Sequence, residues 1–312
     1  MLGSLVDVQT SDGIKLHGFY THAVSRVRSE RESTVWLIVH GVNGNFYGST
    51  LLTDLAKSVQ QVGDDAILVN TRGHDLATFG SADFPARMGS MFESIDDCRY
   101  DLKAWVAYCK GLGYRRIGLI AHSLGAVKGS YALAHHPLDI QRFIAVSPPR
   151  LNTELLMRDP AKWQVFSEQL EEAKKWCEQG IPHQIIRVRF PLPNWVSAAT
   201  FLDKYGSGEK YDYFAWWSKI QVPVLWLFGE QEVRQGSVNF RDVDLALSQR
   251  FLDAGRAIDR NGAFHRVGAS ESSASIPGHD LVVIQNADHS YRKERDELSQ
   301  AISRWILASE NR

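Results

Sequence analysis

The sequence predicts an α/β fold in which helices cover both faces of a mostly parallel β-sheet. Short apolar runs rich in Val, Ile and Leu recur between residues 35 and 284 and are typical of strands that are buried on both faces. Stretches with helical periodicity separate most of these runs, as the crossover between parallel strands requires. With 312 residues, the chain is long enough for one large domain or for a core domain with a smaller insertion.

Each element up to residue 150 follows from its local pattern. Residues 5–10 and 14–20 alternate apolar with polar side chains around Asp12 and Gly13, which predicts a β-hairpin. Residues 35–39 form a continuous apolar run, which predicts a buried strand. The elements that we expect here are the hairpin at 5–20, a loop at 21–33, strands at 35–39, 66–70, 116–121 and 143–146, and helices at 49–61, 91–110 and 123–135.

The alternation of strands and helices stops at about residue 150 and resumes at about residue 220. Residues 151–219 have helical periodicity and mix polar with aromatic residues, but they contain no pattern typical of a buried strand. We therefore predict a core domain formed by residues 1–150 and 220–312, with residues 151–219 inserted as a cap. The elements expected after the cap are a strand at 222–229, a helix at 238–252, a long loop at 255–280, a strand at 281–284 and a helix at 291–308.

Composition and charge exclude several classes of function. The formal net charge of −1 creates no global field that would favour nucleic acid as a partner. The three cysteines form no disulfide framework and have no zinc-binding spacing, so we expect no metal. No apolar run reaches the roughly 18 residues of a membrane span. The first residues lack the features of a signal peptide, so we expect a cytoplasmic protein, and whether it forms a homodimer stays open.

The strongest local motif surrounds Ser123. This serine stands between an apolar strand and a helix, with the small residues Ala121 and Gly125 two positions away on either side. A nucleophile on a sharp turn needs such small neighbours, because the strand and the helix approach each other closely there. The turn also places the N–H of Leu124 at the helix N-terminus, where it can stabilise an oxyanion. The alternative is a serine that only caps an ordinary helix.

This segment resembles the nucleophile elbow of the α/β-hydrolase fold, with Ala121 at a position where the family has glycine. The resemblance extends over most of the chain and implies the α/β-hydrolase fold with its inserted cap. It also implies that the loop after the strand at 35–39, which begins with His40 and Gly41, supplies a second oxyanion donor. That donor would be the backbone N–H of Val42, whereas His40 would have a structural role.

A serine needs a base to act as a nucleophile, and the chain has eleven histidines. His289 follows the last predicted strand and precedes the last helix, which is where the family has its catalytic histidine. His122 neighbours the nucleophile, but the tight turn is expected to direct its side chain elsewhere. His279 precedes the last strand and would lie at the opposite end of the sheet.

The resemblance places the third member of the triad three residues after Gly229, where this chain has Glu232. Its carboxylate would accept the N–H of His289 and fix the tautomer of the imidazole. Glu230 is the local alternative, and Asp242 and Asp244 are weaker ones. Asp288 is expected to stabilise its own loop.

The expected cap holds five of the nine tryptophans of the chain. These side chains suggest a lid over a pocket for a bulky or partly aromatic substrate, although a small insertion also needs aromatic residues for its own core. Arg187 and Arg189 could bind an acidic group of a substrate, but a solvated face is the simpler interpretation.

We therefore expect a serine esterase that cleaves a small carboxylic ester through an acyl-enzyme and needs no cofactor. The chain is most similar to bacterial esterases, monoacylglycerol-lipase-like enzymes and serine aminopeptidase-like hydrolases, and the motifs do not separate these groups. An amidase, a peptidase or an acyltransferase could use the same triad. A receptor that binds a ligand on a hydrolase scaffold without catalysis is the non-enzymatic alternative.

Overall fold

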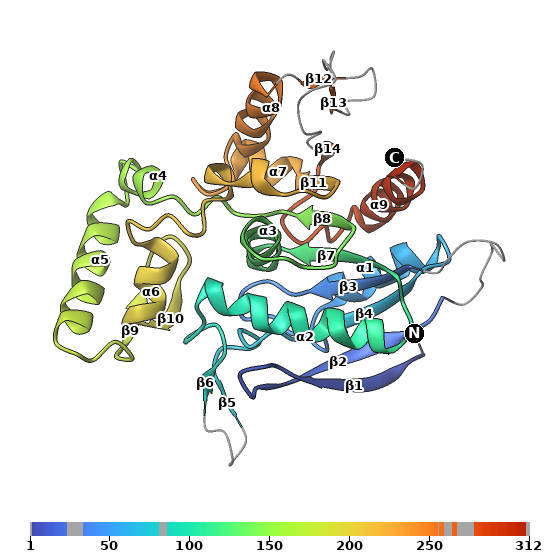
Figure 1. Ribbon diagram of the computed structural model, residues 1–312. Helices are drawn as coiled ribbons and strands as arrows, with labels where there is room; N and C mark the ends of the chain where they lie inside the picture. The colour runs from blue at the N-terminus through green and yellow to red at the C-terminus, as the bar shows by residue number, and fades with distance from the viewer. Residues whose placement is uncertain are drawn as a thin grey trace, which may run out of the picture.

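In the computed structural model, one eight-stranded sheet runs through the molecule and has helices on both faces (Figure 1). The structure describes residues 2–23, 34–80, 86–254, 256–258, 264–266 and 278–309. The strands of the sheet are β1 (Ser4–Gln9), β2 (Lys15–Thr21), β3 (Thr34–Val39), β4 (Asp65–Val69), β7 (Arg116–His122), β8 (Arg142–Val146), β11 (Val224–Gly229) and β14 (His279–Ile284). Their order is β1-β2-β4-β3-β7-β8-β11-β14.

The pairing of the strands confirms the predicted fold class. β1 and β2 form the expected hairpin, and β2 pairs with β4 in the antiparallel direction. All other neighbours in the sheet pair in parallel. Parallel strands end at the same edge of a sheet, so the loops after β3, β7, β11 and β14 meet at one edge.

The helices form one layer on each face of the sheet. α1 and α9 cover one face, and α2 and α3 cover the other (Figure 1). β3 shows why both layers are needed: Val35, Leu37 and Val39 belong to the apolar cluster under α2 and α3, whereas Trp36 and Ile38 belong to the cluster under α1 and α9. The helices of the core are α1 (Thr50–Gln60), α2 (Cys98–Gly111), α3 (Leu124–His135), α7 (Glu230–Gln235), α8 (Val243–Asp253) and α9 (Arg295–Ser309).

The inserted segment, residues 151–219, differs from the prediction by containing a small sheet. β9 and β10 form an antiparallel pair, where no strand was expected. Each strand has four residues. In β9, Ile186 and Val188 are buried and Arg187 is exposed, whereas in β10 Trp195 is exposed and both Val196 and Ser197 are buried. So short an alternation gives no clear strand pattern. The elements of the segment are α4 (Thr153–Met157), α5 (Trp163–Glu178), β9 (Ile185–Val188), β10 (Asn194–Ser197) and α6 (Ala198–Tyr205), followed by two 3₁₀ turns (Tyr213–Ala215 and Trp217–Lys219).

Smaller differences lie at the ends of elements and in loops. The helix expected from residue 91 begins with a 3₁₀ turn at Ile95–Asp97, and two short strands, β5 (Thr78–Phe79) and β6 (Arg87–Met88), pair before it. The loop expected at 255–280 includes paired strands β12 (Arg256–Ile258) and β13 (Phe264–Arg266), and its other residues lie mostly outside the described ones. Most of the loop expected at 21–33 also lies outside them.

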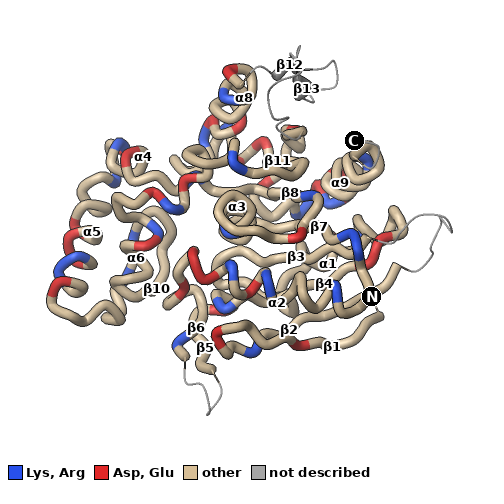
Figure 2. The backbone as a smooth tube through the Cα atoms, in the orientation of Figure 1, with Lys and Arg blue, Asp and Glu red and all other residues tan. Residues whose placement is uncertain are grey.

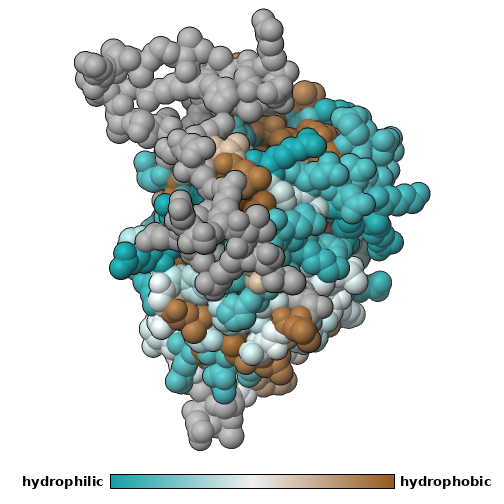
Figure 3. All heavy atoms as spheres, turned by 90° about the vertical axis from the view of Figure 1, so that its right-hand side faces the viewer, coloured by the Kyte–Doolittle hydropathy of each residue, from teal (hydrophilic) through white to brown (hydrophobic). Residues whose placement is uncertain are grey.

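The described residues show no feature in Figure 2 or Figure 3 that by itself indicates a macromolecular partner. Charges of both signs are spread over the fold in the view of Figure 2. On the side drawn in Figure 3, hydrophobic residues outside the grey region form small patches between hydrophilic ones. No helix within the described ranges is long and apolar enough to cross a membrane.

Candidate active site

Ser123 occupies a strained turn at the edge of the sheet where the parallel strands end. It connects β7 directly to α3, with φ of 55° and ψ of −125°. A positive φ is unfavourable for a residue with a side chain and costs about 1–3 kcal/mol, so the surrounding structure must hold it. The N–H of Ser123 donates to the carbonyl of Val146 at the end of β8, at 2.8 Å. The turn therefore fixes the hydroxyl above the end of the sheet.

Small residues are required around this turn because the chain segments nearly touch. A Cβ atom on Gly125 would lie 2.3 Å from the carbonyl oxygen of His40, in the loop after β3. A Cβ atom on Gly41 would lie 3.0 Å from the Cβ of Ser123. Ala121 is fully buried in β7. The loop after β3 is thus packed directly against Ser123.

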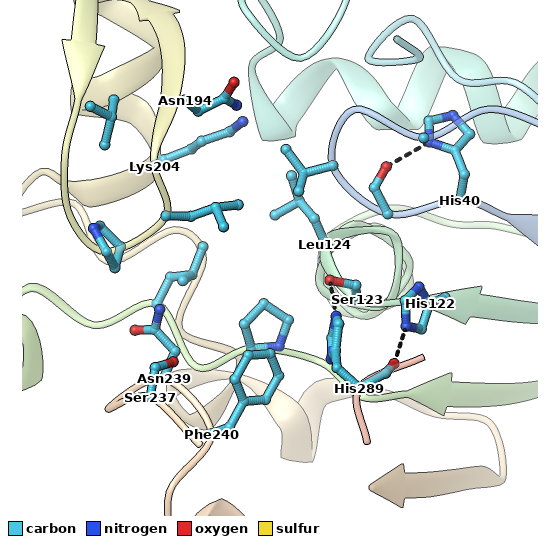
Figure 4. Close-up of a pocket in the computed structure, with 18 of the residues that line it drawn as sticks. His40, His122, Ser123, Leu124, Asn194, Lys204, Ser237, Asn239, Phe240 and His289 are labelled. Atoms are coloured by element: carbon cyan, nitrogen blue, oxygen red, sulfur yellow. Dashed lines mark hydrogen bonds between the residues drawn. The ribbon is translucent and has the colours of Figure 1, made fainter. Parts of the chain in front are cut away.

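His289 and Glu232 complete a chain of hydrogen bonds that begins at Ser123. His289 lies in the loop after β14, and its Nε2 is 3.1 Å from the Oγ of Ser123 (Figure 4). Its Nδ1 is 2.7 Å from Oε2 of Glu232. A carboxylate only accepts hydrogen bonds, so Nδ1 carries the proton and Nε2 is free to accept the proton of the serine hydroxyl. The structure therefore brings together the three residues expected to form a triad.

The carboxylate of Glu232 is held on its other side as well. Oε1 accepts the N–H of Gly229 at 2.8 Å and the hydroxyl of Ser147 at 2.5 Å. The hydroxyl of Tyr291 lies 2.7 Å from that of Ser147, and burial raises the pKa of Tyr291 well above its usual value. Glu232 is itself buried in the first turn of α7. The orientation of the carboxylate is therefore fixed by backbone and side chains alike.

The alternative acids have other partners. Glu230 accepts the backbone N–H of Asn286 at 2.9 Å, and Asp288 accepts that of Ser290 at 2.8 Å. Asp244 forms a two-pronged ion pair with Arg234. Asp242 precedes α8 in a left-handed backbone conformation. Within the described residues, none of these carboxylates forms a hydrogen bond with His289, so the geometry favours Glu232.

Two backbone N–H groups next to Ser123 lack acceptors within the described residues. They belong to Leu124, the first residue of α3, and to Val42, in the loop after β3. Both residues line the same pocket as Ser123. Free N–H groups at a helix N-terminus favour negative charge. This is the arrangement expected of an oxyanion hole.

Two further histidines support the site but do not belong to the hydrogen-bond chain of Ser123, His289 and Glu232. His40 is fully buried; its Nδ1 lies 2.8 Å from the carbonyl of Gly41, and its Nε2 accepts the N–H of Thr71 at 3.2 Å. His122 directs Nε2 to the carbonyl oxygen of His289 at 3.0 Å. Burial lowers the pKa of each to about 3, so both are neutral and act as rigid supports. His122 thus joins the end of β7 to the loop of His289, and His40 joins the loop after β3 to the loop after β4.

Ser123 and His289 lie at one side of a pocket of about 370 Å³, which is large enough for a small organic molecule. The inserted segment forms the opposite wall (Figure 4). Most of this wall is aliphatic, and Tyr205 is its one aromatic residue among the described pocket-lining ones. The apolar residues that line the pocket are Val42, Leu52, Leu124, Pro149, Leu151, Val188, Pro191, Leu192, Val196, Tyr205 and Phe240.

The aromatic residues of the inserted segment mainly serve its packing. Phe166, Phe201 and Tyr205 contact one another, with ring centroids between 5.0 and 6.3 Å apart. Trp216 and Trp217 are buried, whereas Trp163 and Trp195 are exposed. Most of these rings were expected to form a core and two or three to face the pocket; among the described residues of the segment, Tyr205 is the aromatic one that lines it.

Polar residues in the pocket wall had no signal in the sequence. Lys204, Asn194 and Asn239 line the pocket away from Ser123. Lysine and asparagine at these positions belong to no motif, and only the fold brings them together. Among the described residues, no cluster of His, Cys, Asp or Glu could hold a metal ion. Arg187 is exposed, and Arg189 pairs with Glu168 at 2.9 Å, which agrees with the solvated face.

Comparison with known proteins agrees with the architecture. The sequence profile of the α/β-hydrolase fold matches residues 35–184. No curated protein matches the sequence. Among solved structures, Est1E from Butyrivibrio proteoclasticus with ferulic acid bound is 16% identical, has a TM-score of 0.60 and is matched over 98% of this chain and 99% of its own.

Two further solved structures have the same architecture. The Pyrococcus furiosus esterase PF2001 is 16% identical, with a TM-score of 0.60 over 98% of this chain and 91% of its own. The α/β hydrolase GrgF from a Penicillium species is 16% identical, with a TM-score of 0.61 over 97% of each chain. At these identities, the likeness concerns the fold. The profile match, the strand order and these structures together identify the chain as a protein of the α/β-hydrolase fold.

Proposed function

We propose that this protein is a serine hydrolase that cleaves a small carboxylic ester. The observation that carries the proposal is the chain of hydrogen bonds from Ser123 through His289 to Glu232, beside a mainly apolar pocket. A serine that shares its proton with a neutral imidazole, itself oriented by a carboxylate, is an activated nucleophile.

The reaction follows from this geometry. The Oγ of Ser123 attacks the ester carbonyl while Nε2 of His289 takes its proton, and the N–H groups of Val42 and Leu124 stabilise the oxyanion. His289 then gives the proton to the leaving alcohol, which leaves an acyl group on Ser123. Water, deprotonated by His289, attacks this acyl-enzyme, releases the acid and restores the serine. Glu232 keeps its charge and stabilises the imidazolium in both steps.

The inserted segment, residues 151–219, is proposed to act as a cap over this pocket, with residues 1–150 and 220–312 as the core domain. Its contribution of Leu151, Val188, Leu192 and Val196 to the wall supports this role. The esterase from Pyrococcus furiosus and the ferulic acid bound to Est1E support ester chemistry as the choice among reactions that such a triad performs.

Labelling with a fluorophosphonate, which reacts with activated serines, tests the proposal. We expect the native protein to be labelled and the Ser123→Ala variant to remain unlabelled, with ester turnover lowered by more than about 10⁴-fold. Ser130→Ala is the matched control, since Ser130 lies on the same helix and bonds to the carbonyl of Ala126. Equal labelling of the native protein and Ser123→Ala would refute the assignment of the nucleophile.

A further inference from the structure

The pocket has polar groups at places where the proposed ester hydrolysis does not use them. Lys204 and Asn194 lie on the far side of the pocket from Ser123 and His289 (Figure 4). Asn239 and Ser237 lie near a second corner. A purely apolar acyl or alcohol group would leave all of them facing hydrocarbon, which is unfavourable for polar groups.

Lys204 is the most unusual of these residues because its charge is buried. It belongs to α6 of the inserted segment, and its side chain is 4% exposed. Its Nζ donates to Oε1 of Glu93 at 3.0 Å and to the carbonyl of Ser90 at 3.3 Å. An ammonium group has three N–H donors, so one donor of Lys204 has no acceptor among the described residues.

Lys204 shares its directly bonded carboxylate with a second lysine. The other oxygen of Glu93 accepts the Nζ of Lys128 at 3.0 Å, and Lys128 also donates to the hydroxyl of Thr71. Lys128 in addition lies in the field of the buried carboxylate of Asp101, which pairs with Arg72. Burial alone would raise the pKa of Glu93, but the two lysines outweigh burial and lower it to about 2, so this carboxylate is ionised.

Within the described residues, no second carboxylate forms a hydrogen bond with Lys204. Asp203, the neighbour of Lys204 in the chain, bonds instead to Ile95, Lys210 and Tyr211. A buried ammonium group with an unused N–H donor favours a ligand that accepts a hydrogen bond, and an anionic acceptor forms the strongest one.

Asn239 gives an independent indication that the pocket takes a ligand with polar groups. Its side chain is buried, and its Oδ1 has no hydrogen-bond partner in the described structure. Buried amide oxygens are normally paired, and those that are not paired in the free protein require an explanation. A ligand group that donates a hydrogen bond provides one, because Asn239 is part of the wall, so Asn239 indicates a polar ligand but not the carboxylate itself.

On the basis of the proposed function, we propose that the substrate is an ester that carries a carboxylate and that Lys204, assisted by Asn194, binds this carboxylate. The carboxylate accepts the unused N–H donor of Lys204 in a charge-assisted hydrogen bond. The aliphatic wall between Lys204 and Ser123 packs against the carbon chain that joins the carboxylate to the ester. The acidic group thus orients the substrate along the pocket.

Matched ester pairs test this proposal. Monomethyl adipate and its longer homologues carry the carboxylate on the acyl part, with methyl hexanoate as the neutral partner. 6-Acetoxyhexanoate carries it on the alcohol part, with hexyl acetate as the partner. The measured quantity is the ratio of kcat/KM for the acidic ester to that for the neutral ester. In at least one of the two pairs, we expect Lys204→Met to lower this ratio about 10- to 100-fold, because a charged hydrogen bond is lost.

Further variants distinguish the loss of the carboxylate-binding group from a general loss of activity. Lys204→Met leaves Glu93 and Lys128 as a balanced pair, and Lys204→Arg, which keeps the charge, should restore part of the ratio. Lys210→Met is the matched control, because Lys210 belongs to the same segment but is exposed and pairs with Asp203 at 2.9 Å. Its ratio should equal that of the native protein. Equal ratios in the native protein, Lys204→Met and Lys210→Met would overturn the proposal.

A binding measurement covers the case in which Lys204→Met does not fold. In the Ser123→Ala variant, which keeps Lys204, monomethyl adipate or 6-acetoxyhexanoate should raise the melting temperature more than its neutral partner does. A larger shift with both neutral esters would contradict the carboxylate site. Failure of the native protein to hydrolyse any ester would instead refute the proposed function, so the two failures are distinguishable.

Discussion

At the scale of single residues, Glu232 decides whether His289 presents the right nitrogen to Ser123. Replacing Glu232 by Gln puts an amide next to Nδ1, and the amide N–H favours the tautomer in which Nε2 is protonated. We expect kcat for an ester to fall about 10³- to 10⁴-fold. Glu230→Gln should behave like the native protein, because Glu230 bonds only to the loop at Asn286. A larger loss of activity in Glu230→Gln than in Glu232→Gln would show that Glu230 is the acid of the triad.

Ser147 is a positioning residue that acts through Glu232. Its hydroxyl donates to Oε1 of Glu232 and also lies next to the hydroxyl of Tyr291. Ser147→Ala should lower kcat about tenfold and leave KM unchanged, because the carboxylate loses one of its hydrogen bonds. Tyr291→Phe should have a smaller effect, since Tyr291 reaches Glu232 only through Ser147. Steady-state kinetics of both variants check this order, and a larger loss in Tyr291→Phe would contradict it.

At the scale of elements, the contact between α3 and the loop after β3 limits which side chains the turn accepts. A methyl group on Gly125 would lie 2.3 Å from the carbonyl of His40, so Gly125→Ala must push helix and loop apart. We expect the free energy of unfolding to fall by about 1–3 kcal/mol and catalysis to fall with it. Urea denaturation measures the first effect.

Gly111→Ala is the matched control for this contact. Gly111 ends α2, and a Cβ atom there would meet nothing within 4 Å. Alanine is the better helix former, so this variant should be as stable as the native protein or slightly more stable. Similar destabilisation of both variants would show that the loss at Gly125 does not come from the close approach.

The aromatic composition of the inserted segment suggests that its rings line the pocket, but most of these rings pack elsewhere. Phe166, Phe190, Phe201 and Tyr205 pack together near α5 and α6, whereas Tyr213, Trp216 and Trp217 contact aromatic residues outside the segment. The pocket wall is left to aliphatic residues and to Lys204. Composition therefore predicted that the segment has a core, but not which residues face the substrate.

At the scale of the whole molecule, two buried neutral histidines should make stability depend on pH. The pKa values of His40 and His122 are lowered by burial from 6.5 to about 3. As the pH falls below about 6.5, the unfolded chain binds protons at these residues and the folded protein does not. The folded state therefore loses stability, by up to about 1.4 kcal/mol per pH unit for each histidine, until the pH approaches about 3.

Urea denaturation between about pH 7.5 and about pH 5 measures this dependence, since most carboxylates stay ionised there. In His122→Asn, one of the two histidines is missing, and asparagine can still donate to the carbonyl of His289. The slope of stability against pH should be about half that of the native protein. An unchanged slope would exclude His122 as a source of the dependence.

The sequence by itself determined the fold class, because apolar strand runs and helical periodicity report burial directly. It also located Ser123 as the proposed nucleophile, since a nucleophile on a tight turn needs small neighbours, and the resemblance to the α/β-hydrolase family indicated His289 and Glu232. Only the tertiary structure decided that Glu232 rather than Glu230 reaches His289, because the direction of each carboxylate depends on α7 and on the hydroxyl of Ser147.

The sequence also could not predict that three charged residues form a group, because only the tertiary structure brings together Lys204, Glu93 and Lys128. They come from α6, from the loop before α2 and from α3, and no periodicity relates them. A buried charge is tolerated only where the three-dimensional fold supplies its partners, so its position is a property of packing and not of local sequence. The local sequence pattern determines which elements form and where a motif lies. Side-chain contacts between distant elements determine which charged residues line the pocket.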